Sequence, residues 1–342
     1  MSMNPKNILE VRDLVVKFKM SEGIVHAVNG VSYDVPEGKS IGIVGESGCG
    51  KTVSSYALNR LLPNNATLSG QILFRQRDGK IIDIAKLKPD GREIRDIRGK
   101  DIAMIFQEPM TSLSPVHTIC NQISEALILH QGMTKKQARN RTIELLKLVG
   151  IPQAERRVDE YPFQFSGGMR QRAMIAMALA RNPRVLIADE PTTALDVTLQ
   201  AQVLNLIQDL QNRFNLSMIL ITHALGVVAH MVETVNIMYL GRIVETGPTL
   251  QIFEEPHHPY TQGLLQSIPK LTGRLGERVN SIPGSVPSAY DIPKGCPFAA
   301  RCKHCMEICR EEMPQAVTVG TGHTVYCHLY TGREAARDAA NA

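Results

Sequence analysis

A glycine-rich stretch near the N-terminus has the spacing of a phosphate-binding loop. Residues 45–52 read GESGCGKT, which fits the pattern G-x-x-x-x-G-K-[ST]. Glycine lets the backbone curl so that successive N–H groups converge on phosphate oxygens. Lys51 would reach the β- and γ-phosphates, and the Thr52 hydroxyl would hold Mg²⁺. An ordinary glycine-rich turn beside a surface lysine is the alternative. The residues expected to cradle the phosphates are Gly45, Ser47, Gly48, Cys49, Gly50, Lys51 and Thr52.

Two adjacent carboxylates could bind the metal ion and activate water at a nucleotide site. Asp189 and Glu190 close the apolar run VLIADEP, which is typical of a buried parallel strand. Asp189 would then lie at a strand end, where it can hold Mg²⁺. Glu190 is free to orient and deprotonate a water molecule. Without the phosphate loop, a solvated acidic pair would be the better interpretation.

The elements that position these residues indicate an α/β fold. The run Ile41–Val44 predicts a buried strand before the phosphate loop, and the apolar pattern after Lys51 predicts a helix. From residue 8 to about 247, short β-branched runs alternate with longer helical patterns. The start, ILEVRDLVVKF, predicts an antiparallel edge strand, and residues 108–165 predict a helical insertion.

A second anion-binding turn is predicted within the helical part. Ser166, Gly167 and Gly168, in FSGGMRQ, offer a hydroxyl and bare backbone amides at the start of a helix. A single nucleotide has no use for two such sites in one subunit.

These residues resemble the ABC ATPase family in six motifs that follow the family's order. They are GESGCGKT as Walker A, Gln107 in IFQEP as the Q-loop, FSGGMRQ as the signature, VLIADEP as Walker B, Asp196 in TALD as the D-loop, and His223 in ITHALG as the switch histidine. The resemblance implies that two such domains close head-to-tail, so that Walker A of one and the signature of the other bind the same ATP.

The resemblance also implies a role for each residue. Ser166, Gly168 and Asp196 would serve the nucleotide of the neighbouring domain. Phe18 is the expected adenine-stacking aromatic, with core packing as the alternative. Glu190, His223 and Gln107 are the expected catalytic residues, and Thr52, Gln107 and Asp189 are the expected Mg²⁺ ligands.

Three positions depart from the common family pattern. Met169 replaces glutamine and Phe165 replaces leucine in the signature, and both are tolerable because Ser166 and the backbone contact the phosphate. Ala224 follows His223 where aspartate is more usual, which could loosen the switch loop. Hydrolysis is still expected because Glu190 is present.

Composition bounds the class of protein. The 342 residues are 43% hydrophobic and 21% charged, as in ordinary globular proteins, and suffice for two domains. The net charge of +5 comes without a dense basic block, so nucleic acid is not an expected partner. We expect no signal peptide and no membrane span, because charged and polar residues interrupt the most apolar region, residues 218–240.

Five of the seven cysteines fall in the last fifth of the chain, which indicates metal binding rather than disulfides. Residues 254–329 resemble the C-terminal region of ATPases from oligopeptide and dipeptide importers, some of which hold a [4Fe–4S] cluster. The spacing leaves zinc open as an alternative, as well as a set that includes Cys305. By the resemblance, the expected ligands are Cys296, Cys302, Cys309 and Cys327. The pair His257 and His258 is interpreted as structural.

We therefore expect an ABC-type ATPase domain over residues 1–250, with an antiparallel β subdomain and a helical subdomain at about 108–180. A proline-rich, loop-dominated C-terminal domain would cover 251–342. The resemblance implies an ATPase subunit of a peptide importer, peripheral on the cytoplasmic face of the membrane. Its expected partners are a second, different ATPase subunit, two transmembrane permeases contacted by the segment from Gln107 to Pro115, and an extracytoplasmic peptide-binding protein. A nickel or other small-solute importer, a soluble ABC protein outside transport, and a subunit with poor turnover are the alternatives.

Overall fold

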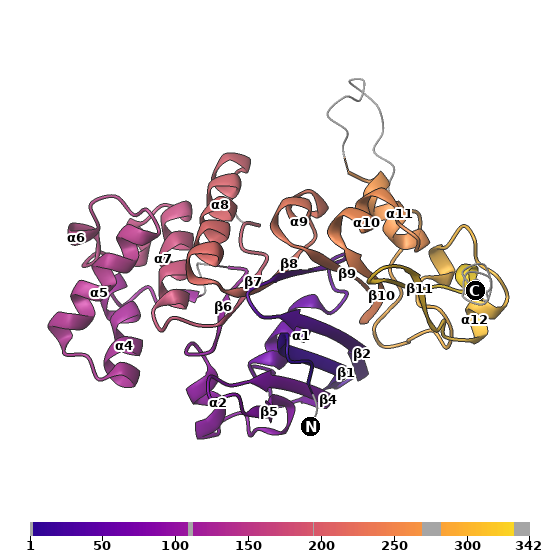
Figure 1. Cartoon of the computed structure of the whole chain (residues 1–342), viewed down its shortest axis with the longest axis horizontal. Helices are drawn as coiled ribbons and strands as arrows, with labels where there is room; N and C mark the ends of the chain where they lie inside the picture. Colours follow the sequence, from indigo (N-terminus) through magenta and orange to yellow (C-terminus); the bar gives the residue numbers. More distant parts are fainter. Residues whose placement is uncertain (1–2, 109–111, 194, 269–281, 332–342) are drawn as a thin grey trace. The chain divides into compact units, whose positions relative to one another are not determined.

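The computed structural model describes residues 3–108, 112–193, 195–268 and 282–331 (Figure 1). Its backbone contacts divide the chain into two compact units. The first unit comprises Met1–Val35, Ser40–Lys86 and Ile221–Ala342, and the second comprises Pro36–Lys39 and Leu87–Leu220. The first unit thus joins the N-terminal part of the chain to its C-terminal part.

The first unit contains an antiparallel sheet in the order β2-β1-β4-β5. Its strands are β1 (Asn7–Met20), β2 (Gly23–Pro36), β4 (Ala66–Arg75) and β5 (Ile81–Asp83). The expectation of an edge strand at the N-terminus is wrong in one respect. Strand β1 is antiparallel, but it lies between β2 and β4, because the next strand in sequence folds back along its other side.

The first unit also holds a mixed set of strands around the start of the phosphate loop. Strand β3 (Ser40–Val44), fully buried as predicted, pairs in parallel with β9 (Thr234–Tyr239), and β9 pairs antiparallel with β10 (Arg242–Pro248). Two strands from the tail, β12 (His323–Tyr326) and β11 (Ala316–Gly320), extend this set beyond β10. The tail is therefore less loop-dominated than its prolines suggested.

Short helices complete the first unit (Figure 1). Helix α1 directly follows the phosphate loop. Helix α11 begins with Pro259, and proline suits the first position of a helix because the N–H that it lacks would have no partner within the helix. The helices are α1 (Lys51–Leu58), α9 (Leu225–Met231), α10 (Thr249–Glu254), α11 (Pro259–Gln266) and α12 (Ile308–Glu311), with 3₁₀ turns η1 (Ile84–Lys86), η3 (Ala299–Arg301) and η4 (His328–Tyr330).

The second unit is built on the predicted parallel strands. Strand β6 (Ile102–Ile105) pairs in parallel with β7 (Val185–Asp189), and β8 (Ser217–Thr222) is the neighbour of β7 in strand order. Every residue of β7 and β8 is buried, as expected of strands covered on both faces.

Helices fill the rest of the second unit, as the sequence predicted for residues 108–165. Helix α5 begins with a capping box between Thr134 and Gln137 and ends just before Gly150, which has a φ of +74°. The helices are α2 (Arg92–Ile97), α4 (Ile119–Gln131), α5 (Lys135–Leu148), α6 (Ala154–Arg157), α7 (Gly167–Leu179) and α8 (Val197–Phe214), with the 3₁₀ turn η2 (Pro162–Gln164).

Among the described residues, no helix combines the length and the apolar character needed to cross a bilayer. Part of the segment from Gln107 to Pro115, residues 109–111, lies outside the described residues. The same holds for residues 269–281 and 332–342 of the predicted C-terminal domain.

Candidate functional site

The phosphate loop connects β3 to α1 and requires glycine for two separate reasons. Gly48 and Gly50 have φ values of +78° and +98°, a region that side chains with a Cβ rarely adopt. A Cβ on Gly45 would overlap the carbonyl oxygen of Met238, and one on Gly50 would overlap that of Ala27. The loop is therefore tightly enclosed at Gly45 and Gly50 by its own unit.

Lys51 curls back over the loop that precedes it. Its side chain is buried, and Nζ donates to the carbonyl oxygens of Gly45, at 2.8 Å, and Glu46, at 3.0 Å. Thr52 follows in the first turn of α1, where helix N–H groups and the helix dipole favour an anion. Burial raises the pKa of the Cys49 thiol, so that Cys49 contributes backbone rather than a reactive thiolate. Ser47 and Gly48 are exposed at the loop surface.

The two predicted carboxylates lie at the end of β7, in the second unit. Asp189 is fully buried, and Glu190 has a φ of +45°, which is rare outside glycine. One carboxylate oxygen of Glu190, Oε2, accepts from Thr193 Oγ1 at 2.8 Å and from Gln107 Nε2 at 3.3 Å. The structure thus brings Gln107 to Glu190, and the strained backbone fixes where the Glu190 carboxylate lies.

The signature turn begins α7 with its polar groups outward. Ser166 and Gly167 are exposed, and Ser166 Oγ accepts from the backbone N–H of Met169 at 3.3 Å as a helix N-cap. Gly168 is buried against Leu199, whose side chain would lie 3.3 Å from a Cβ at this position. An anion could therefore approach this turn from solvent.

Asp196 has a structural role in addition to the predicted one. Its Oδ1 accepts from the backbone N–H groups of Thr198, at 3.1 Å, and Leu199, at 3.0 Å, and so caps α8. The side chain is exposed. The family resemblance predicted the D-loop but did not identify this cap.

The two remaining nucleotide residues belong to the first unit. His223 is exposed directly after β8. The turn that follows is held by Thr222, whose Oγ1 accepts from the N–H of Ala224 at 3.0 Å. Phe18 is half-buried in β1, opposite Ala66.

Four of the five tail cysteines line one small cavity. These are Cys296, Cys302, Cys309 and Cys327, and His258 lines the same cavity. Cys305 is not among the lining residues, and its Sγ donates to the Met306 carbonyl at 3.5 Å. Burial raises the pKa of Cys296 to about 12 and that of Cys327 to about 11, which favours neutral thiols unless a cation offsets the desolvation.

His258 carries an unsatisfied polar atom at this cavity. Its Nδ1 accepts from the backbone N–H of Tyr260 at 3.1 Å, which leaves the proton of the neutral ring on Nε2. Within the described part of the chain, the buried Nε2 has no hydrogen-bond partner. Burial also lowers the pKa of His258 to about 4. A buried donor of this kind favours an acceptor inside the cavity.

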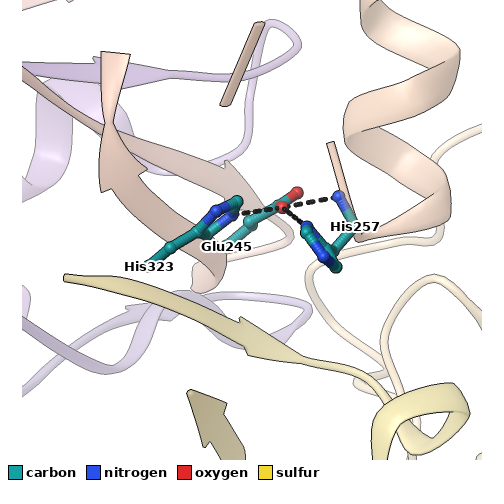
Figure 2. A group of neighbouring side chains, drawn as sticks. All are labelled: Glu245, His257 and His323. Carbon is teal, nitrogen blue, oxygen red and sulfur yellow. Dashed lines mark hydrogen bonds and ion pairs between the residues drawn. The ribbon is translucent and has the colours of Figure 1, made fainter. Parts of the chain in front are cut away.

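A second group of possible metal ligands comes from distant parts of the sequence (Figure 2). Ligand atoms of Glu245, His257 and His323 lie within 4.8 Å of one another. Glu245 accepts from the N–H groups of His257, at 2.7 Å, and His258, at 3.0 Å, and pairs with His323 Nε2 at 2.8 Å. Burial alone would raise the pKa of Glu245, but these hydrogen bonds outweigh it and hold the pKa below its usual value. We interpret the group as a buried hydrogen-bonded anion that joins β10, β12 and the start of α11.

Sequence reasoning missed Thr193 and Glu245. Thr193 is three residues after Glu190, so its spacing could have identified it as a partner. Glu245 and His323 are 78 residues apart and leave no local signal.

Comparison with known proteins places these residues in a family. The family model for ABC transporters matches residues 28–193, and that for the C-terminal region of oligopeptide/dipeptide transporters matches residues 244–309. The chain is 48% identical to the oligopeptide transport ATP-binding protein OppD of Bacillus subtilis over 93% of this chain and 87% of the relative. It is 47% identical to the dipeptide transport ATP-binding protein DppD of the same organism over 96% of each.

A solved structure resembles the chain as well. The dimeric structure of MJ0796, a bacterial ABC transporter cassette, matches with a TM-score of 0.61 and 28% identity, over 70% of this chain and 98% of that one. By these identities and family matches, the protein belongs to the ATP-binding proteins of ABC transporters that carry the oligopeptide/dipeptide C-terminal region.

Proposed function

We propose that this ATPase lies at the cytoplasmic face of the membrane and energises the import of di- and oligopeptides. The observation that carries the proposal is the near full-length identity of 47–48% to relatives named for oligopeptide and dipeptide transport, together with the C-terminal region matched at residues 244–309. Two transmembrane permeases and an extracytoplasmic peptide-binding protein are the proposed partners. The segment from Gln107 to Pro115 is the proposed contact with the permeases.

ATP would be bound and hydrolysed by residues of the phosphate loop, the Q-loop and Walker B. The enclosed phosphate loop supplies converging N–H groups and the Lys51 ammonium. Mg²⁺ would be held by oxygens of Thr52, Gln107 and Asp189, a donor set that suits a hard cation, and when bound it would neutralise phosphate charge. Glu190 would deprotonate the attacking water, because hydrogen bonds from Thr193 and Gln107 fix its carboxylate.

Two further residues would complete the nucleotide site. His223 would contact the γ-phosphate, and its exposure after β8 leaves the ring accessible. Phe18, half-buried in β1, would stack on adenine.

The signature turn would serve a nucleotide bound to a second ATPase subunit. Ser166 and Asp196 are exposed, and Gly168 lies in the same turn as Ser166, so this surface is open to another chain. The proposed partner is a different ATPase subunit, which would make a heterodimer. The proposed domain division is a nucleotide-binding domain over 1–250, with the helical subdomain at about 108–180, and a C-terminal domain over 251–342.

The cysteine cavity would hold a [4Fe–4S] cluster. Support comes from the four cysteines around one cavity and from the orphaned Nε2 donor of His258, which an inorganic sulfide or thiolate could satisfy. Bound iron would offset the burial that raises the thiol pKa values of Cys296 and Cys327. When bound, the cluster would cross-link four points of the tail and could sense redox conditions.

Zinc is the alternative metal at the cysteine site. A single zinc ion draws four sulfurs to about 2.3 Å from one point. A [4Fe–4S] cluster instead holds its four cysteine sulfurs on separate iron atoms and contains inorganic sulfide, so metal and sulfide content distinguish the two.

Measuring iron, acid-labile sulfide and zinc in anaerobically purified protein tests the cofactor. We expect iron and sulfide in wild type and in Cys305→Ser, but not in Cys302→Ser. Stoichiometric zinc without sulfide would replace the cluster in this proposal, and retention of iron by Cys302→Ser would refute the ligand set.

The transport proposal is tested in cells that lack this chain. Wild-type protein should restore uptake of a labelled tripeptide, whereas Glu190→Gln should bind ATP with its turnover reduced at least about 100-fold and should not restore uptake. Asp209→Asn, an acidic residue of α8 outside the site, is the control. Restored nickel uptake without peptide uptake would favour the small-solute alternative.

A further inference from the structure

One buried arginine connects the cysteine-bearing segment to the phosphate loop. Arg301 lies directly before Cys302, and its side chain is 4% exposed. Its Nη1 and Nη2 donate to Oε2 and Oε1 of Glu46 at 2.6 and 3.1 Å. Glu46 is the second residue of the phosphate loop, and both residues belong to the first unit. A two-pronged pair of this kind fixes the carboxylate in the plane of the guanidinium.

The remaining donors of Arg301 are also in use. Nε donates to the Pro283 carbonyl at 3.1 Å, Nη2 to the Ile282 carbonyl at 3.3 Å, and Nη1 to the Tyr239 hydroxyl at 3.4 Å. The guanidinium also lies 5.8 Å and 5.9 Å from the ring centres of Tyr239 and Phe298. With five N–H groups directed at acceptors, the position of this side chain is strongly determined, unlike that of an exposed ion pair.

Glu46 is held at its backbone as well. Its N–H donates to the hydroxyl of Tyr260, in α11, at 2.9 Å. Its carbonyl accepts from Nζ of Lys51 at 3.0 Å. The tail thus contacts Glu46 through the carboxylate and the N–H, while the phosphate-binding lysine contacts the carbonyl. A shift of Glu46 would therefore change where Lys51 lies.

The position of Arg301 depends in turn on the cysteine segment. Arg301 ends the 3₁₀ turn η3, in which its N–H donates to the Phe298 carbonyl at 3.0 Å and the Cys302 N–H donates to the Ala299 carbonyl at 3.3 Å. This turn lies within the segment from Cys296 to Cys302, and both of these cysteines line the cavity. The same short turn therefore sets two sulfur positions and the guanidinium.

We propose that Arg301 is a positioning residue that couples the cysteine site to nucleotide affinity. A filled cysteine site orders the segment from Cys296 to Cys302, and this segment places Arg301. Arg301 in turn holds Glu46 and with it the phosphate loop. Loss of the metal group then weakens ATP binding without any contact between that group and the nucleotide. The coupling to metal rests on the cofactor proposed above, whereas the contact between Arg301 and Glu46 does not.

The first test measures binding of Mg²⁺ and a fluorescent ATP analogue to full-length, metal-loaded protein. Arg301→Gln and Glu46→Gln should each weaken binding about tenfold. The double variant should bind no worse than either single variant, because the two residues act as one unit. Arg301→Lys should fall between wild type and Arg301→Gln, because lysine keeps the charge but not the two-pronged geometry.

Controls separate positioning from general damage. Lys303→Gln removes one exposed positive charge two residues away and should bind like wild type. Iron content and melting temperature are measured for every variant, so that binding is compared among folded, loaded proteins. Wild-type affinity in Arg301→Gln, or additive losses in the double variant, would overturn the proposal.

The second test removes the metal group with a chelator under anaerobic conditions. Wild type should lose about the same factor of nucleotide affinity as Arg301→Gln, and Arg301→Gln should lose no more. Unchanged affinity of stripped wild type would overturn the coupling while leaving the cofactor in place. Protein that contains neither iron nor zinc as purified would refute the cofactor and the coupling together, and peptide uptake would still test the transport role separately.

Discussion

Two glycine-containing turns in this protein each begin a helix, and their surroundings differ. The two ends of the phosphate loop in the first unit are enclosed, with Gly45 and Gly50 against backbone carbonyls and Lys51 buried, while its middle is exposed. The signature turn of the second unit exposes Ser166 and Gly167. Both turns offer the unpaired N–H groups of a helix N-terminus. Enclosure gives the first a preformed shape, whereas the second has a surface that another chain can cover.

The largest expected effects come from one substitution in each turn, and they distinguish nucleotide binding by the isolated chain from turnover by the assembled transporter. Lys51→Ala should remove nucleotide binding to the isolated chain, because the ammonium over the loop is lost. Ser166→Arg should leave that binding intact. In the assembled transporter each should lower turnover at least about 100-fold. Equilibrium binding and ATPase rates measure the two effects.

The matched control is Lys135→Ala, which removes an exposed lysine at the start of α5 and should retain binding. Loss of nucleotide binding by the isolated Ser166→Arg chain would contradict the assignment of this turn to a second subunit.

A matched pair of glycine substitutions tests the enclosure itself. Gly50→Ala should cost more than about 3 kcal/mol, because it combines a φ of +98° with overlap of the Ala27 carbonyl. Gly167→Ala, whose Cβ would lie 3.9 Å from Leu195, should change the free energy of unfolding by less than about 1 kcal/mol. Denaturant unfolding measures both. Equal losses would mean that the two turns are equally enclosed.

Lowering the pH should destabilise the region around the phosphate loop before it destabilises the signature turn. His258 caps α11, which carries Tyr260, and burial lowers its pKa from 6.5 to about 4. The neutral buried form is therefore stable relative to the unfolded chain above pH 6.5, and this stability is lost as pH falls toward 4. The loss should total about 3 kcal/mol.

Denaturant unfolding of metal-free protein between pH 7 and pH 4 measures this loss, and hydrogen exchange should show residues 45–52 opening before residues 166–168. In His258→Asn, which keeps a helix cap but does not titrate, the pH dependence should become shallower. An unchanged pH dependence in that variant would rule out His258 as its source.

The smallest effect concerns the helix cap of the signature. Ser166→Ala should lower the free energy of unfolding by about 1 kcal/mol, because the acceptor for the Met169 N–H is lost. Ser166→Thr keeps the cap and should stay near wild type. Thermal unfolding provides the measurement, and no loss in Ser166→Ala would show that the cap has no energetic role.

The sequence alone determined the local chemistry of this protein. Glycine spacing, the carboxylate pair and the serine at a helix start depend on neighbours within a few residues, so the phosphate loop, β7 with Glu190 and the cap by Ser166 were predictable. Helix α5 was predictable for the same reason, from its apolar period and Gly150.

Tertiary structure alone decided which distant segments hold each other. The partner of Glu46 is 255 residues away at Arg301, and that of Glu245 is 78 residues away at His323. In the same way, strand β12 of the tail pairs with β10. Burial and hydrogen-bond geometry in the folded chain determine such contacts, and the local periodicity of the sequence does not predict them. That four cysteines share a cavity while Cys305 does not was likewise settled by folding, because spacing in sequence does not fix distance in space.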